Sequence, residues 1–180
     1  MTEAIKTYRT RVHGLLGDRH TIYDEEGEIG VLTMERKFFR VVSATYRPKK
    51  GEVLLFRRDP GLLRGQFSMW TEHREWLGSS LRWNFLKREL RVETGSRPYR
   101  VLPLPAFRRG WRLCAPKTGE MARIDAGLFG RGTRMEVYRR MDFELLLFSY
   151  FLGSQVYLES IWPGPGLEEE ATSLPSPSKA

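Results

Sequence analysis

The chain has 180 residues, of which 41% are hydrophobic and 29% charged, and it carries a net charge of +8. This length suits one domain with its own core. The single cysteine, Cys114, excludes an internal disulfide and fits a reducing cytoplasm, while Lys6 and Arg9 interrupt the apolar stretch that a secretory signal peptide would need.

Short strands separated by turns are predicted from residue 21 onward. A strand reaching Asp24, a Glu-Glu-Gly turn and a second strand from Glu28 form a hairpin in which Gly27 supplies a positive φ. A further strand is predicted over residues 36–46, ending at Pro48, because proline removes a ladder donor.

Apolar pieces continue through residues 53–94 at intervals of about ten residues, which is typical of an all-β sandwich or barrel. Residues 81–90 fit a short helix or a strand, and the alternation around Leu90 and Val92 favours the strand. Ser79 and Ser80, following Gly78, are interpreted as the end of a turn.

The same plan of strand, glycine turn and strand returns between residues 98 and 140. Trp111 and Leu113 alternate with Arg112 and Cys114, a turn follows at residues 116–119, and the chain leads back through Ile124. We expect Trp111 and Phe85 to lie inside the fold and Gly127, Gly130 and Gly132 to form a hairpin turn. Met135 and Val137 then mark the strand that leads to Asp142.

Residues 142–162 form the most apolar segment of the chain, DFELLLFSYFLGSQVYLESIW. Asp142 is a suitable N-cap and Pro163 a suitable stop for a helix, which would be apolar on every side. A membrane span needs roughly 20 consecutive apolar residues, and Ser149, Gly153 and Gln155 interrupt this run. The sequence therefore predicts a helix enclosed by protein within a domain of residues 1–162, followed by a disordered acidic Pro/Ser tail at 163–180.

Three segments together resemble the tubby C-terminal-like superfamily, which includes the LURP-one-related proteins and the phospholipid scramblases. They are TIYDEEGEIGVL, WRLCAPKTGEMARIDA and TRMEVYRRMDFELLLFSYFLGSQVYLESIW, and the resemblance spans residues 20–162. It implies a mainly β fold, a closed antiparallel barrel of about twelve strands enclosing the hydrophobic C-terminal helix. For function it implies phosphoinositide binding or lipid movement, although the proline-rich arm, cysteine cluster and calcium loop of the scramblases are missing.

Positive charge concentrates in residues 82–140, which hold 15 Lys and Arg against 5 Asp and Glu. Guanidinium groups bind phosphate oxygens in a bidentate fork, and neighbouring aromatics can lie at a lipid interface or stack on bases. The predicted phosphate-binding residues are Lys87, Arg88, Arg91, Arg108, Arg109 and Arg112. Anionic lipid at a membrane surface, nucleic acid and a merely solvated surface all fit this pattern.

Catalytic and metal-binding patterns are not evident in the sequence. His13, His20 and His73 lack zinc-site spacing and are interpreted as surface or turn residues, and Cys114 as an unreactive thiol. We therefore predict a non-catalytic binding or scaffold module without a cofactor. A hydrolase whose residues are distant in sequence stays open as an alternative.

Overall fold

A computed structural model describes residues 3–14, 17–37, 40–59, 66–84, 89–95, 97–104, 109–126 and 132–161. The strands are β1 (Lys6–His13), β2 (Arg19–Tyr23), β3 (Glu28–Lys37), β4 (Arg40–Pro48), β5 (Leu54–Arg58), β6 (Phe67–Thr71), β7 (Trp76–Asn84), β8 (Glu89–Thr94), β9 (Pro98–Pro103), β10 (Gly110–Ala115), β11 (Gly119–Ala126) and β12 (Gly132–Val137). One helix follows, α1 (Phe143–Ile161).

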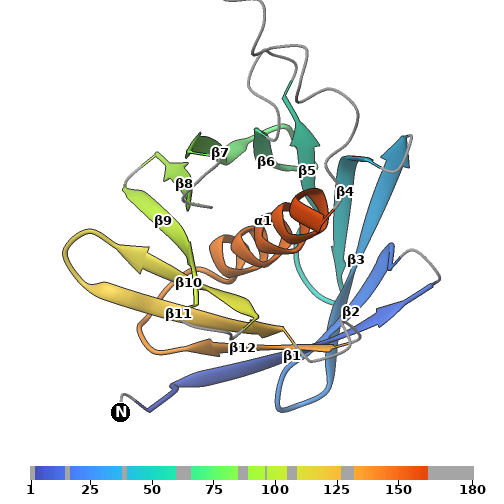
Figure 1. The fold of residues 1–180 in the computed structure, drawn as a ribbon. Coiled ribbons are helices and arrows are strands. Elements are labelled where there is room, and N and C mark those ends of the chain that lie inside the picture. The colour runs from blue at the N-terminus through green and yellow to red at the C-terminus, as the bar shows by residue number, and fades with distance from the viewer. Residues whose placement is uncertain are drawn as a thin grey trace, which may run out of the picture.

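Each strand pairs antiparallel with the next along the chain, and β1 pairs with β12 to close the barrel. The ring of strands surrounds α1, as Figure 1 shows. Closure leaves no unpaired sheet edge, and twelve strands give an interior wide enough for more than side chains alone. The predicted closed antiparallel barrel around a C-terminal helix is confirmed.

The helix is buried because its apolar side chains meet the inward residues of the strands. Leu146, Leu147, Phe148 and Phe151 are fully inaccessible to solvent. Ser149 is also inaccessible, and its hydroxyl donates a hydrogen bond of 2.8 Å to the Leu145 carbonyl, so no polar group is stranded there. Among the residues the structure describes, no helix is long and apolar enough to cross a membrane.

Aromatic rings from β5 and β6 pack on the middle of α1. The ring centroids of Phe56 lie 5.3 Å from Phe148 and 5.1 Å from Phe151, while Phe67 lies edge-on to Phe151 at 4.9 Å. Trp111 of β10 is 8% exposed, which confirms the expected interior position. Its ring lies so close to Gly153 of α1 that a Cβ there would come within 2.5 Å of the Trp111 Cδ1.

Most predicted strands are present, with differences in detail. The hairpin at Gly27, whose φ is 131°, is confirmed. The predicted start of the strand over residues 36–46 is wrong, because β3 extends to Lys37 and β4 begins only at Arg40. Residues 81–84 and 89–90 belong to strands, as predicted. Phe85, the turn at Gly127 and Gly130, and the tail at 163–180 lie outside the described residues.

Two assignments of polar residues are wrong. Ser79 and Ser80 lie inside β7, where the buried Ser80 hydroxyl accepts a hydrogen bond from the Phe67 N–H at 3.0 Å. His20 is 5% exposed and therefore not a surface residue. It shares the inward face of β2 with Ile22, because strand residues two apart point to the same side.

His20 connects β2 to the helix through buried hydrogen bonds. Its Nε2 donates to the Gly17 carbonyl at 2.7 Å, and its Nδ1 accepts from the Tyr150 hydroxyl. That hydroxyl lies 3.3 Å from the Thr10 Oγ1, which accepts from the Thr133 N–H at 3.2 Å. Burial lowers the pKa of His20 below 6.5 and raises the pKa of Tyr150 to about 12, so both groups are neutral near pH 7.

Candidate anion-binding site

The outer face of β8 to β11 carries the described part of the predicted basic surface. Arg91 lies on β8, Arg109 precedes β10, and Arg112 lies on β10 between the inward side chains of Trp111 and Leu113. Lys87, Arg88 and Arg108 lie outside the described residues, so their part in the site stays a prediction. The three described arginines are therefore spread along one side of the barrel.

Strand register brings arginines together that are distant in the sequence. Arg91 lies opposite Arg100 of β9, and Arg112 lies opposite Arg123 of β11. Like charges directly opposite each other on neighbouring strands repel, so such pairs need nearby carboxylates or bound anions. The sequence shows the arginines but not this pairing, which depends on the register.

Carboxylates neutralise most of this surface. Glu89 binds Arg100 with two hydrogen bonds of 2.6 and 2.8 Å, Arg91 lies 3.1 Å from Glu93, and Arg123 lies 2.9 Å from Glu120. These side chains are between 25% and 53% exposed, so the ion pairs are partly screened by solvent. A phosphate group could therefore replace a carboxylate partner at small cost.

Arg112 differs from its neighbours on this surface. It is half-buried, and no acceptor among the described residues binds its Nε, which is closed to solvent. Buried donors are nearly always hydrogen-bonded, because desolvating one without a partner costs about 1–3 kcal/mol. The Arg112 Nε is therefore a buried donor without a partner among the described residues, which is a cost to stability.

A surface hollow of about 380 Å³ lies beside these arginines. It is lined by Glu89, Arg91, Pro98, Arg100 and Pro116. It thus contains two guanidinium groups together with the Glu89 carboxylate that binds Arg100. An anionic headgroup entering this hollow would compete with Glu89 for Arg100.

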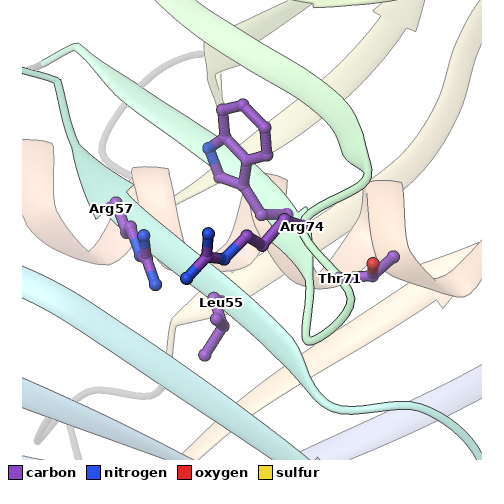
Figure 2. Close-up of a pocket in the computed structure, with 5 residues that line it drawn as sticks. Leu55, Arg57, Thr71 and Arg74 are labelled. Atoms are coloured by element: carbon purple, nitrogen blue, oxygen red, sulfur yellow. The ribbon is translucent and has the colours of Figure 1, made fainter.

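A second pair of arginines, Arg57 on β5 and Arg74 in the turn between β6 and β7, is not predicted from the sequence. A hollow of about 260 Å³ is lined by Leu55, Arg57, Trp70, Thr71 and Arg74 (Figure 2). The alternation of outward Leu55 and Arg57 with inward Leu54 and Phe56 predicts their side of the strand. Their approach to Arg74 depends on the β5–β6 pairing, which that alternation does not determine.

Nucleophilic and metal-binding groups are few in the described part of the chain. Burial raises the pKa of the Cys114 thiol, so the thiolate is disfavoured, and the Ser80 hydroxyl is occupied by the Phe67 backbone. The described residues contain no group of three or more His, Cys, Asp or Glu that could hold a metal ion.

Comparison with known proteins supports the architecture. No protein-family model matches the chain, and no curated protein matches it. The fold is similar to the X-ray structure of the Arabidopsis thaliana protein AT5G01750, with a TM-score of 0.53 and 16% identity over 89% of this chain and 94% of that one. At this identity the likeness shows the fold alone.

Proposed function

We propose that the protein is a non-catalytic binding module that recognises anionic phospholipid headgroups through the outer face of β8 to β11. The observation that carries the proposal is the pairing of arginines across this face, where Arg91 lies opposite Arg100 and Arg112 lies opposite Arg123. A phosphate group bound on this face would accept hydrogen bonds from the guanidinium groups and reduce the repulsion across the strand pairs.

Membership of the tubby-like superfamily forms part of the same proposal. Its support is the combination of a closed twelve-stranded barrel, an enclosed apolar helix and Asp142 directly before that helix. Each Lys or Arg near an anionic membrane contributes about 1 kcal/mol, so a group of four to six such residues can hold a protein reversibly at a surface. The protein would then lie in the cytoplasm and bind membranes peripherally.

Vesicle sedimentation tests this function. Phosphoinositide-containing and neutral vesicles are compared at about 150 mM salt for the wild type and for a variant with Arg91, Arg109 and Arg112 replaced by Gln. We expect the wild type to sediment with the phosphoinositide vesicles and the variant to lose most of this binding. A control with Arg9, Arg11 and Arg47 replaced by Gln removes the same charge from other strands and should retain it.

Nucleic acid is the competing partner for the same face, since arginine also binds a phosphate backbone without regard to sequence. A shift assay with duplex and single-stranded oligonucleotides in the same buffer separates the two. Preference for an oligonucleotide over the vesicles would contradict the lipid proposal. Equal vesicle binding by the wild type and the triple variant would show that these three arginines do not bind the lipid.

A further inference from the structure

The hollow between β5, β6 and the turn at residues 72–75 differs from the basic face in having unpaired charges. Arg57 and Arg74 are exposed, and within the described ranges neither guanidinium has a hydrogen-bond or ion-pair partner. By contrast, the Nε of the adjacent Arg58 donates to the Val41 carbonyl at 3.0 Å, and its guanidinium lies 4.8 Å from the Phe67 ring centroid. The hollow therefore holds two available cations.

Figure 2 shows the side chain of Arg74 extending across the hollow toward Arg57, above Leu55. Two guanidinium groups that converge without a carboxylate between them repel each other, and an anion between them would change repulsion into attraction. The fork of each guanidinium suits the oxygens of a phosphate group.

The turn that carries Arg74 is held by several hydrogen bonds. The Thr71 N–H donates to the Glu75 carbonyl at 2.9 Å, the Arg74 N–H to the Thr71 carbonyl at 3.1 Å, and the Glu75 N–H to the Thr71 Oγ1 at 3.2 Å. Arg74 has a φ of 69°, in the left-handed region that favours glycine. The turn thus positions a long cationic side chain where a residue without a side chain would fit the backbone better.

Aromatic surface adjoins the two cations. Trp70 lines the hollow and is half-buried, and it pairs in register with Leu55 of β5 and with Trp76 of β7. Trp76 is 43% exposed, whereas most large apolar side chains among the described residues are buried. An indole beside a phosphate-binding arginine offers a stacking face to a planar ring, and such stacking tolerates any base.

We infer that this hollow binds a small ligand that joins a phosphate group to a planar ring, which is the chemistry of a nucleotide. Arg57 and Arg74 hold the phosphate, and Trp70 stacks on the ring. A volume of about 260 Å³ lies just under the roughly 300 Å³ at which small-molecule pockets begin. The size suits one ring and one phosphate.

The charges around the hollow argue against a bilayer as the occupant. The exposed Glu72 and Glu75 lie in the same turn as Arg74, and Glu52 lies 3.9 Å from His73 in that turn. These carboxylates oppose an extended anionic surface, whereas a single phosphate can be held directly between the two guanidinium groups. The inference therefore concerns a ligand other than the lipid of the proposed function and rests on different strands.

Calorimetric titration with adenosine monophosphate and uridine monophosphate tests the site. We expect both to bind, with adenosine, uridine and inorganic phosphate each binding at least roughly tenfold more weakly, because each retains only half of the contacts. A single-stranded oligonucleotide forms a further arm. Binding that is tighter for the oligonucleotide and displaced by the monophosphates would identify a strand as the source, and the reverse order a free nucleotide.

Variants assign the binding to the hollow. Replacing Arg57 and Arg74 by Gln should weaken monophosphate binding at least roughly tenfold, as should Trp70→Leu. Arg74→Gly removes the guanidinium while relieving the positive φ, so it should lose binding and keep or raise the unfolding midpoint. The matched control, Arg9→Gln with Arg11→Gln, should bind as the wild type does.

Absence of monophosphate binding by the wild type, or equal binding by the Arg57/Arg74 variant, would overturn the inference. Loss of vesicle binding in that variant without any monophosphate binding in the wild type would also overturn it, in favour of a lipid site. The triple variant at Arg91, Arg109 and Arg112 should still bind monophosphates. Failure of this site and failure of the proposed lipid function are therefore separable.

Discussion

The interior of the barrel and its outer face use side chains in opposite ways. Inside, rings such as Phe56 of β5 and Phe148 and Phe151 of α1 are fully buried and pack against one another. Outside, Arg91 and Arg100 are 44% and 53% exposed at the side chain and bind carboxylates on their own or a neighbouring strand. Buried rings contribute about 3–5 kcal/mol each, whereas exposed ion pairs contribute about 0–1 kcal/mol. The buried rings therefore supply most of the folding stability. The exposed ion pairs can be exchanged for contacts to a ligand at little cost to that stability.

The largest effect is expected from a charge in the interior. Phe148→Asp places a carboxylate where the wild-type side chain is inaccessible to solvent, with no cation to pair with it among the described core residues. The cost of several kcal/mol is comparable with the whole stability of a domain. We expect no soluble folded protein, whereas Phe148→Leu should fold with a lower thermal midpoint in circular dichroism. Cooperative unfolding of soluble Phe148→Asp would contradict an enclosed helix.

Overpacking at the contact between α1 and β10 should have the next largest effect. In Gly153→Ala the added Cβ meets Trp111 Cδ1 at 2.5 Å and Nε1 at 2.8 Å. The strain should exceed the gain in helix propensity and destabilise the protein by about 1–3 kcal/mol in urea unfolding. Combining it with Trp111→Leu should restore part of that loss, because the two changes share one contact. Additive losses would show that Gly153 does not pack against Trp111.

Acidification should weaken the interior through His20. Burial lowers the pKa of His20 in the folded protein, so the unfolded chain binds the extra proton first as pH falls. The stability from keeping His20 neutral is complete above its ordinary pKa of 6.5, and below it is lost at up to about 1.4 kcal/mol per pH unit until the folded pKa is reached. Thermal midpoints between pH 7.5 and pH 5 should fall less steeply in His20→Gln. The His73→Gln control, at an exposed position, should follow the wild type.

The architecture of the barrel can be predicted from the sequence, but the side-chain arrangement at the two candidate sites cannot. All-round apolarity of residues 142–162 predicts the enclosed helix, observed as α1 (Phe143–Ile161), and alternation with turn residues predicts the strands. Local patterns cannot reveal that Tyr150 binds His20, or that Arg57 and Arg74 line one hollow. Ser79 and Ser80 after Gly78 predict the end of a turn, because Gly and Ser are frequent in turns, but all three residues lie in β7. In the barrel this glycine instead lies against the Glu93 carbonyl, which a Cβ would approach to 2.9 Å.

The smallest effect on stability, and the most specific effect on function, is expected at Arg112. Arg112→Met keeps the half-buried aliphatic stem and removes the donor that lacks a partner, so the free energy of unfolding should stay the same or rise by about 1 kcal/mol. Vesicle binding should nevertheless fall, because a phosphate contact is lost.

The most direct test is sedimentation of Arg112→Met with phosphoinositide vesicles, next to an Arg11→Met control. It asks whether an outer arginine contributes to vesicle binding without contributing to folding stability. The account predicts weaker binding by Arg112→Met, binding like the wild type by the control, and unfolding midpoints at least equal to that of the wild type for Arg112→Met. Undiminished binding by a fully folded Arg112→Met would contradict it.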